Sequence, residues 1–286
     1  MKNDHTSFGQ GRIKDNNSFL FLVVKAWHTV GTFIKMISNR ASKFYSGTSG
    51  LALSLPKRSF PPEFQDKSRL QYYASIFNSI EINSSFYKVP MASTVRKWSE
   101  SVHENFRFTF KLWKEITHNK GLVFKPGDIV NFFETINETG NKKGCLLVQF
   151  PPSMDITNMA QLKKLSLFLR KSDPGYQWKI AFEFRNKSWY QEAVYDLLYS
   201  YQIGVVLHDL PASAISLLDS PNEFVYLRFH GPNGGYRGSY ADDFLYEYAR
   251  YISEWLEEEK DVYVYFNNTM GDAEKNLLTL NKFVGV

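Results

Sequence analysis

From residue 44 onward, the hydrophobic residues alternate between two patterns. Short runs rich in β-branched and aromatic residues are typical of strands, and each is followed by a stretch with the three- and four-residue spacing of helices. The strand pattern is found at residues 44–48, 79–82, 107–112, 145–149, 179–184, 204–207, 224–229 and 262–266. The helical pattern is found near residues 66–77, 92–100, 128–138, 158–171, 190–200, 241–258 and 272–283.

This order predicts an α/β fold, because strands that alternate with helical crossovers pair in parallel. Eight such strands predict a TIM-type (β/α)8 barrel in residues 44–286. The segment 212–218 is short and ambiguous, so irregular or missing helices belong to the prediction. An open doubly wound sheet is the alternative, but the glycine-rich turn of a dinucleotide-binding sheet is absent after the first strand.

Residues 1–43 are interpreted as an N-terminal extension, with a polar, disordered segment followed by an amphipathic helix at 19–37. This helix would pack on the body, lie on an anionic surface or serve as a targeting signal. A start at Met36 is a further alternative. Lys25 and Lys35 interrupt the hydrophobic run, so no transmembrane span is expected. The hydrophobic positions of the helix are Leu20, Val23, Val24, Trp27, Val30, Ile34 and Ile37.

The net charge of +5 comes from this extension. The chain of 286 residues has 34 Lys and Arg and 29 Asp and Glu, of which residues 1–43 contain seven and two, so the body has 27 of each sign. A globally basic nucleic-acid-binding domain is therefore not supported, although a local basic groove stays open. The single cysteine excludes an internal disulfide framework and indicates a reducing, cytoplasmic location.

Polar and ionisable residues follow almost every predicted strand. The carboxyl ends of the strands of such a barrel meet at one face, where active sites lie, so these residues are expected to form a common site. Glu81 and Glu183 are the candidates for general acid and base, with His208 or His230 as proton shuttle. The residues expected to hold negative charge or to orient the ligand are Asn83, Lys111, Gln149, Arg185, Arg228, Arg237, Asn267 and Asn268.

The segment 230–240, after the seventh strand, contains four glycines, Arg237, Ser239 and two tyrosines. Glycine lets backbone N–H groups approach an anion closely, and arginine binds phosphate in a bidentate manner. Barrels often bind phosphate with the loops after the seventh and eighth strands. We therefore expect ligand contacts from Tyr236, Arg237, Gly238 and Tyr240. Asp209, which follows the sixth predicted strand, is expected to contact the ligand as well.

Each candidate also has a structural alternative. Glu81 and Glu183 would then pair with Lys111 or Arg185 in salt bridges, and His230 would be a hydrogen-bonded core histidine. The asparagine and glutamine candidates would satisfy backbone groups, and the glycine-rich segment would be a loop without a ligand. The sequence leaves these alternatives open, because it does not reveal which side chains converge.

No fingerprint of a nucleotide cofactor is present, so the cofactor is unknown. A metal is not favoured, because basic residues are expected at the same end of the barrel as the possible ligands. Cys145 is expected at the start of the fourth strand, far from the site, and therefore in the core. The possible metal ligands are Glu81, Glu183, His208, Asp209 and His230.

Eight motifs of the body carry a resemblance to a known family. They are YSGTSG at 45–50, EINSSFY at 81–87, FKLW at 110–113, LVQFPP at 147–152, FEFR at 182–185, YLRFHG at 226–231, YRGSY at 236–240 and VYFNN at 264–268. They resemble the YecE-like family, catalogued as domain of unknown function 72, over about residues 44–283. The resemblance implies a TIM-type barrel and no established reaction, cofactor or substrate. Residues 51–62 lack the tryptophan-containing stretch usual in the family, so a common ligand would be held differently.

Three functions fit these observations. The first is an enzyme, a hydrolase or an isomerase, that acts on a small anionic or phosphate-bearing ligand by carboxylate and histidine acid–base chemistry. The second is a nucleic-acid-binding protein or a nuclease with a shape similar to endonuclease IV. The third is a noncatalytic protein that binds a small molecule. The aromatic residues that would stack on bases are Trp113, Trp189, Tyr236 and Tyr240.

Overall fold

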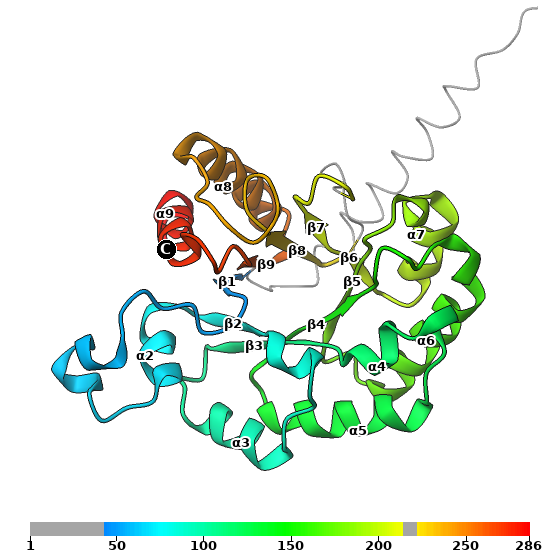
Figure 1. Ribbon diagram of the computed structural model, residues 1–286, viewed down its shortest axis with the longest axis horizontal. Coiled ribbons are helices and arrows are strands. Elements are labelled where there is room, and N and C mark those ends of the chain that lie inside the picture. Colours follow the sequence, from blue (N-terminus) through cyan, green and yellow to red (C-terminus); the bar gives the residue numbers. More distant parts are fainter. Residues whose placement is uncertain (1–42, 214–221) are drawn as a thin grey trace, which may run out of the picture. The chain divides into compact units, whose positions relative to one another are not determined.

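Short parallel strands form the centre of the computed structural model, which describes residues 43–213 and 222–286 (Figure 1). The predicted N-terminal extension lies outside the described residues, as does most of the ambiguous segment 212–218. The strands are β1 (Phe44–Thr48), β2 (Ser79–Ile82), β3 (Arg107–Lys111), β4 (Lys143–Gln149), β5 (Lys179–Glu183), β6 (Gly204–Val205), β7 (Leu207–His208), β8 (Phe224–Phe229) and β9 (Asp261–Phe266).

The strands follow one another around a ring. Hydrogen bonds order them as β2-β3-β4-β5-β6 and as β1-β9-β8-β7, with every pair parallel. Only Val206 separates β6 from β7, so these two short strands occupy one position of the ring and link the two sheets. A single parallel bridge between Ser49 and Glu81 joins β1 to β2. The described strands thus have the eight positions of a TIM-type barrel.

Side chains close the seam between β1 and β2, where the backbone ladder is nearly absent. The Tyr73 hydroxyl accepts from the Thr48 N–H at 2.7 Å and donates to the Ser79 carbonyl at 3.1 Å. Asn78 bonds the backbone of β1 with both ends of its amide, at 2.9 Å each. These bonds satisfy backbone groups that would otherwise be buried without partners.

Replacing Tyr73 by phenylalanine should lower the free energy of unfolding by about 1–3 kcal/mol, because the Thr48 N–H and the Ser79 carbonyl lose their common partner. The midpoint of urea unfolding measures the effect. Tyr199→Phe is the control, since this ring is 52% exposed. If the two variants unfolded at the same urea concentration, the Tyr73 hydroxyl would not stabilise the seam between β1 and β2.

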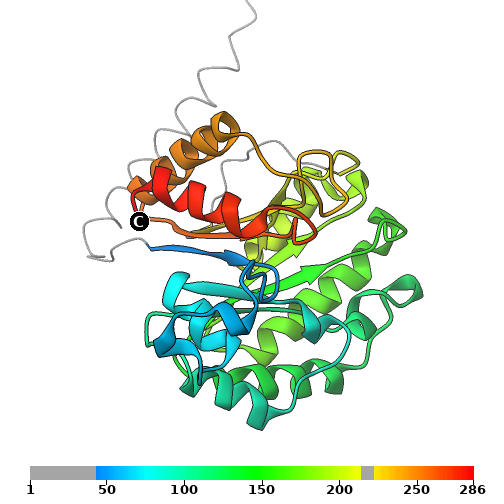
Figure 2. The same cartoon turned by 60° about the vertical axis from the view of Figure 1, so that its left-hand side comes forward.

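The helices cover the outside of the ring, with α8 and α9 across the strands from α3 and α5 (Figures 1 and 2). Two of them begin at a helix-starting signal: a capping box formed by Ser68 and Gln71 at the start of α2, and Pro126 at the first position of α5. The helices are α2 (Arg69–Ile76), α3 (Ala92–Glu100), α4 (Lys114–Thr117), α5 (Pro126–Ile136), α6 (Met159–Ser172), α7 (Glu192–Ser200), α8 (Asp242–Glu257) and α9 (Ala273–Val284). Short 3-10 turns lie at Lys57–Ser59, Pro62–Phe64, Asn83–Phe86, Lys120–Leu122, Asn137–Thr139, Ile156–Asn158 and Lys187–Trp189.

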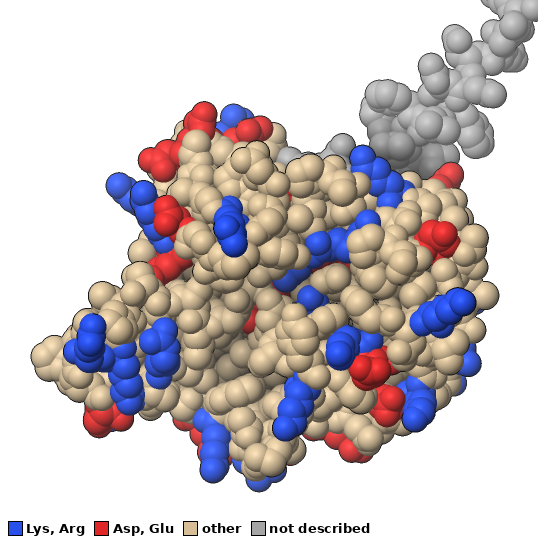
Figure 3. Space-filling model, in the orientation of Figure 1, with Lys and Arg blue, Asp and Glu red and all other residues tan. Residues whose placement is uncertain are grey.

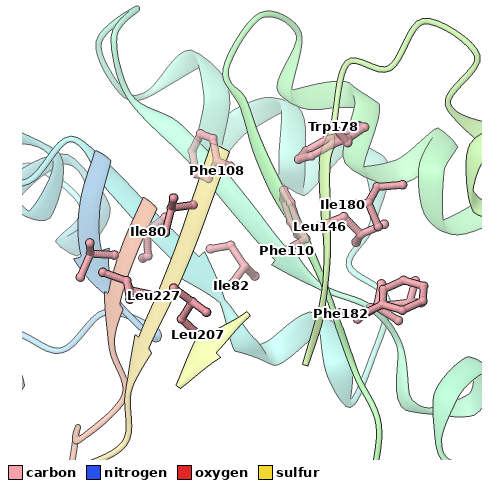
Figure 4. Close-up of a cluster of buried hydrophobic side chains, with 14 of the residues drawn as sticks. Ile80, Ile82, Phe108, Phe110, Leu146, Trp178, Ile180, Phe182, Leu207 and Leu227 are labelled. Atoms are coloured by element: carbon pink, nitrogen blue, oxygen red, sulfur yellow. The ribbon is translucent and has the colours of Figure 1, made fainter. Parts of the chain in front are cut away.

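Two hydrophobic cores follow from the alternation of side chains along the strands. The larger core lies between the strands and the helices, and Figure 4 shows its residues on β2 to β5, β7 and β8. The smaller core fills the inside of the barrel and is rich in tyrosine. It consists of Tyr45, Cys145, Leu147, Ala181, Val206, Phe224, Tyr226, Tyr263 and Tyr265.

The predicted α/β barrel is confirmed, and the strands lie within two residues of their expected bounds. The fourth strand begins earlier than expected, at Lys143, and the sixth is split at Val206. The short helix α4 and the 3-10 turns were not expected, because they are too short to show a hydrophobic period. Within the described residues, no helix combines the length and the hydrophobicity that crossing a bilayer requires.

Candidate functional site

The carboxyl ends of the strands form the barrel mouth, and the side chains that point into it follow directly from the inner core. Side chains two positions apart on a strand face the same side, so the inward-facing positions at the carboxyl end of each strand lie at the mouth. We define the barrel mouth by Ser49, Glu81, Lys111, Gln149, Glu183, His208, Arg228 and Asn267. The strands therefore bring Glu81, Lys111, Glu183, Arg228 and Asn267 to one end of the barrel, as the sequence predicts.

Three charged side chains from non-adjacent strands meet in this mouth. Arg228 on β8 donates from Nε and from Nη2 to the two oxygens of Glu81 on β2, at 2.9 and 2.7 Å. Its Nη1 donates to Glu183 on β5. All three side chains are fully buried. The salt-bridge alternative therefore holds for both carboxylates, but Glu81 pairs with Arg228 and not with Lys111 or Arg185.

Glu81 is saturated by hydrogen bonds. In addition to the bidentate contact with Arg228, its Oε1 accepts from the Ser49 hydroxyl and its Oε2 accepts from the Tyr226 hydroxyl. Asn83 in turn donates to the Ser49 hydroxyl. Ser49 is one of the polar residues at the end of the first predicted strand, but it was not a candidate for ligand binding.

Arg185 and His230 extend the network from Glu183. The Arg185 guanidinium donates to the Glu183 carboxylate, and its Nη2 lies 3.2 Å from Nε2 of His230. Nη1 of Arg228 lies 3.1 Å from the same nitrogen. Nδ1 of His230 faces Oδ1 of Asp209 at 3.2 Å. The ring is thus held with its Nδ1–H toward a carboxylate and its Nε2 lone pair toward two arginines.

Both glutamates stay ionised in this setting. Burial alone would raise the pKa of Glu81, but the charge and hydrogen bonds of Arg228 lower it below its ordinary value. For Glu183, burial is again outweighed, here by the charges of Arg185 and Arg228, which hold its pKa well below its ordinary value. A carboxyl group with a lowered pKa has no proton to donate near neutral pH. The two glutamates are therefore unsuited to act as general acids.

Both histidines of the mouth are neutral. Burial lowers the pKa of His230 to about 4. Burial also lowers the pKa of His208, whose Nε2 lies 3.1 Å from the Phe184 carbonyl and whose Nδ1 accepts from the Leu210 N–H at 3.3 Å. Each ring uses both nitrogens for contacts within the protein.

Lys111 differs from the other charged residues of the mouth. Its Nζ lies 4.1 Å from the centre of the Phe86 ring, and no described residue forms a salt bridge or hydrogen bond with it. Burial, followed by the charge of Arg228, lowers the pKa of Lys111 to about 8. His118, which was not a candidate for the site, packs on Phe86 and has its pKa lowered to about 4 by burial and then by Lys111.

The glycine-rich loop 230–240 is tightly folded. Gly231 has a φ of 103°, and a Cβ atom at this position would lie 2.2 Å from the Arg237 carbonyl oxygen, so only glycine fits. The Tyr240 hydroxyl accepts from the Gly231 N–H and donates to Asp209. Asp209 and Tyr240 thus hold the loop, and their contact with a ligand stays a prediction.

The end of β9 and the start of α9 hold the other side of this loop. Asn268 donates to the Gly238 carbonyl and to Oδ1 of Asn276, both at 3.0 Å. Asn276 accepts from the Tyr240 N–H at 3.2 Å and donates to the Ser239 hydroxyl at 3.0 Å. Asn276 was missed because it looks like any polar residue of a helix.

The other candidates of the loop and mouth differ in their exposure. Arg237 is exposed and has no salt bridge with a described residue, and Tyr236 is 38% exposed. Gln149 is half-buried and pairs in register with Glu183, whereas Asn267 is buried. Figure 3 shows Lys and Arg side chains inside a hollow near the centre of the molecular face in view. Among the described residues, no group of three or more His, Cys, Asp and Glu is arranged to hold a metal.

Comparison with known proteins identifies the family. A family model described as protein of unknown function DUF72 matches residues 45–286. This chain belongs to the DUF72 family. A relative, the UPF0759 protein YunF of Bacillus subtilis, is 29% identical to this chain over 258 residues. The match covers 76% of this chain and 86% of that protein. The resemblance to the YecE-like family is therefore confirmed.

Solved structures of DUF72 family proteins have the same fold. The protein from Enterococcus faecalis has a TM-score of 0.70 and 23% identity, and the match covers 85% of this chain and 96% of that one. The protein from Thermotoga maritima has a TM-score of 0.67 and 25% identity over 85% of this chain and all of that one. These matches support the barrel, and the names of these DUF72 and UPF0759 proteins state no activity.

Proposed function

We propose that this protein is an enzyme that acts on a small anionic or phosphate-bearing ligand bound at the barrel mouth. The observation that carries the proposal is the environment of Lys111, whose Nζ has no salt-bridge or hydrogen-bond partner among the described residues. The two carboxylates of the mouth are already occupied by Arg228 and Arg185. An anion from outside the protein would supply the missing partner.

The proposal assigns proton transfer to Lys111 instead of the carboxylates and histidines suggested by the sequence. Glu81 and Glu183 hold the two arginines in position. A lysine with a pKa of about 8 is present in both protonation states near neutral pH, as a general acid or base requires. Arg185 and Arg237 are the additional cations for the ligand, and the reaction class, hydrolysis or isomerisation, stays open.

The anion site is tested with sulfate, which keeps its two charges over the pH range of interest. We expect Lys111→Met to weaken sulfate binding at least about tenfold, or about 1.4 kcal/mol, because the unpaired cation is lost. In the wild type the affinity should fall as the pH rises through about 8, because only the protonated amine attracts the anion. Isothermal titration calorimetry at constant ionic strength measures both effects.

Two variants serve as controls. Lys114→Met removes an exposed lysine, which lies 3.9 Å from Glu115, and should bind sulfate like the wild type. Lys111→Arg keeps a cation that does not titrate in this range, so its affinity should not fall with rising pH. If Lys111→Met and Lys114→Met bind sulfate equally well, the proposed anion site is wrong.

The alternatives make different predictions. A noncatalytic binding protein would bind the anion without chemistry at Lys111. A nucleic-acid-binding protein would need stacking surfaces, but the rings of Trp189 and Tyr240 are buried, and only Tyr236 of the expected four is exposed. No contact of the described residues specifically favours the nucleic-acid hypothesis.

A further inference from the structure

We propose that the Lys111 amine forms an imine with the carbonyl carbon of a small anionic aldehyde or ketone. This inference rests on the proposed function, because it takes the anion site at the barrel mouth and names the substrate class. It gives Lys111 the role of a nucleophile. The argument uses the position of Nζ, the charges around it and a free donor group on Arg185.

The surroundings of Nζ disfavour a permanent ammonium ion. A buried lysine is normally held by partners that compensate its charge. In this protein, Lys142 donates to the Ser99 and Val102 carbonyls at 2.7 and 2.9 Å and lies 3.3 Å from Glu104. Lys111 instead lies against the aromatic face of Phe86, with no carboxylate within salt-bridge distance in the described chain. Lysines are activated as nucleophiles in this way, by desolvation and by nearby cations.

Charged groups of several strands act on Lys111 together. Burial disfavours its protonated form most, and Arg228 and then Arg185 add to this effect, whereas Glu183 and Glu81 favour the protonated form. The two glutamates are each held by an arginine, which reduces their effect on the lysine. His118 is neutral and adds no charge. The balance leaves a substantial fraction of free amine near neutral pH, and the free amine is the form that attacks a carbonyl.

Arg185 offers a place for the anionic end of the same ligand. Its Nε and Nη2 donate to Glu183, and Nη2 also faces His230. Its Nη1 donates to no residue of the described chain. The side chain is 10% exposed, so this free N–H group can meet a carboxylate or phosphate that enters the mouth.

The step balances without an oxidant or a reductant. The Nζ lone pair attacks the carbonyl carbon, a C–N bond forms, and the C=O π electrons move to oxygen, which takes a proton to give a carbinolamine. The nitrogen loses one of its two protons. The hydroxyl group then takes up a proton and leaves as water, and the nitrogen lone pair forms the C=N bond. The protonated imine can then accept electrons from a neighbouring bond, as isomerisation next to a carbonyl requires.

Reductive trapping tests this inference. The purified full-length protein is incubated with pyruvate near pH 8, where the free amine is abundant, and then reduced with borohydride. Mass spectrometry of the intact protein and its peptides is expected to find one reduced pyruvyl group, on Lys111. The yield should exceed that on any exposed lysine, for example Lys114, at least about tenfold. Dihydroxyacetone phosphate is used in parallel as the phosphate-bearing probe.

Lys111→Arg is the decisive variant, because it keeps a positive charge and removes the primary amine. It should bind sulfate within about threefold of the wild type, with a loss below about 0.7 kcal/mol, but should form no adduct at the mouth. Lys114→Arg should trap both probes on Lys111 like the wild type. Sulfate binding without any adduct on Lys111 from either probe would overturn the imine proposal and leave the proposed function standing. If the wild type neither bound sulfate nor formed an adduct on Lys111, both the imine proposal and the proposed function would be overturned.

Discussion

Replacing Arg228 by methionine is expected to lower the free energy of unfolding by about 3–5 kcal/mol. The guanidinium makes a bidentate contact with Glu81 and a further contact with Glu183, and all three side chains are fully buried. Methionine would leave Glu81 buried without a counter-charge, whereas Glu183 would keep Arg185. The midpoint of urea unfolding, with the slope of the transition, measures the loss.

Two further variants make this prediction specific. Arg237→Met removes an exposed arginine that pairs with no described residue, so it should stay within about 0.5 kcal/mol of the wild type. The double variant Arg228→Met/Glu81→Gln removes the charge that would be orphaned, so it should be more stable than Arg228→Met alone. A double variant as unstable as the sum of its single changes would show that the pair is not coupled by charge.

Replacing Gly47 by alanine is expected to cost about 3 kcal/mol or more, because the added methyl group has no space at the seam between β1 and β2. A Cβ atom on Gly47 would lie 2.1 Å from the Ser79 carbonyl oxygen and 3.0 Å from the Tyr73 hydroxyl. Either β1 and β2 move apart or the hydrogen bonds of Tyr73 break. Both changes open the ring between β1 and β2, where the backbone ladder is nearly absent. Urea unfolding again measures the effect.

Gly127→Ala is the matched control. Gly127 lies in the first turn of α5, and an added Cβ would meet no atom within 4 Å. Alanine there should be neutral or stabilising by up to about 1 kcal/mol, because it restricts the unfolded chain. If both glycine variants had the same stability as the wild type, the close approach of β1 to β2 would have no energetic significance.

The strands and most helices could be predicted because each carries a local signal. The alternation of hydrophobic residues located every strand position of the ring, and its order implied a parallel barrel. The break at Val206 and the helix α4 had no such signal, because two- and four-residue elements are shorter than the period that identifies them. The nearly absent ladder between β1 and β2 was also not predictable, since Tyr73 and Asn78 replace it from outside the strands.

The sequence predicted where the candidate site lies, but not which charged residues pair with each other. Glu81, Glu183 and Arg228 all follow from the ends of strands, yet the choice of Arg228 as the partner of Glu81 joins residues 147 positions apart. Tyr240 and Asp209 were expected to contact a ligand, and the structure uses them to hold the loop 230–240. Asn276 and Ser49 each hold neighbouring groups by several hydrogen bonds, and no sequence pattern indicates these partners.

The sequence by itself determined which segments become strands and helices, that the strands are parallel, and which side chains stand at their carboxyl ends. These features depend on the local period of hydrophobic residues, and neighbours along the chain set that period. The tertiary structure decided which of these charges neutralise one another and left Lys111 without a counter-charge. Such pairing depends on distances of a few ångströms across a closed ring of strands, and these distances exist only after the ring has formed.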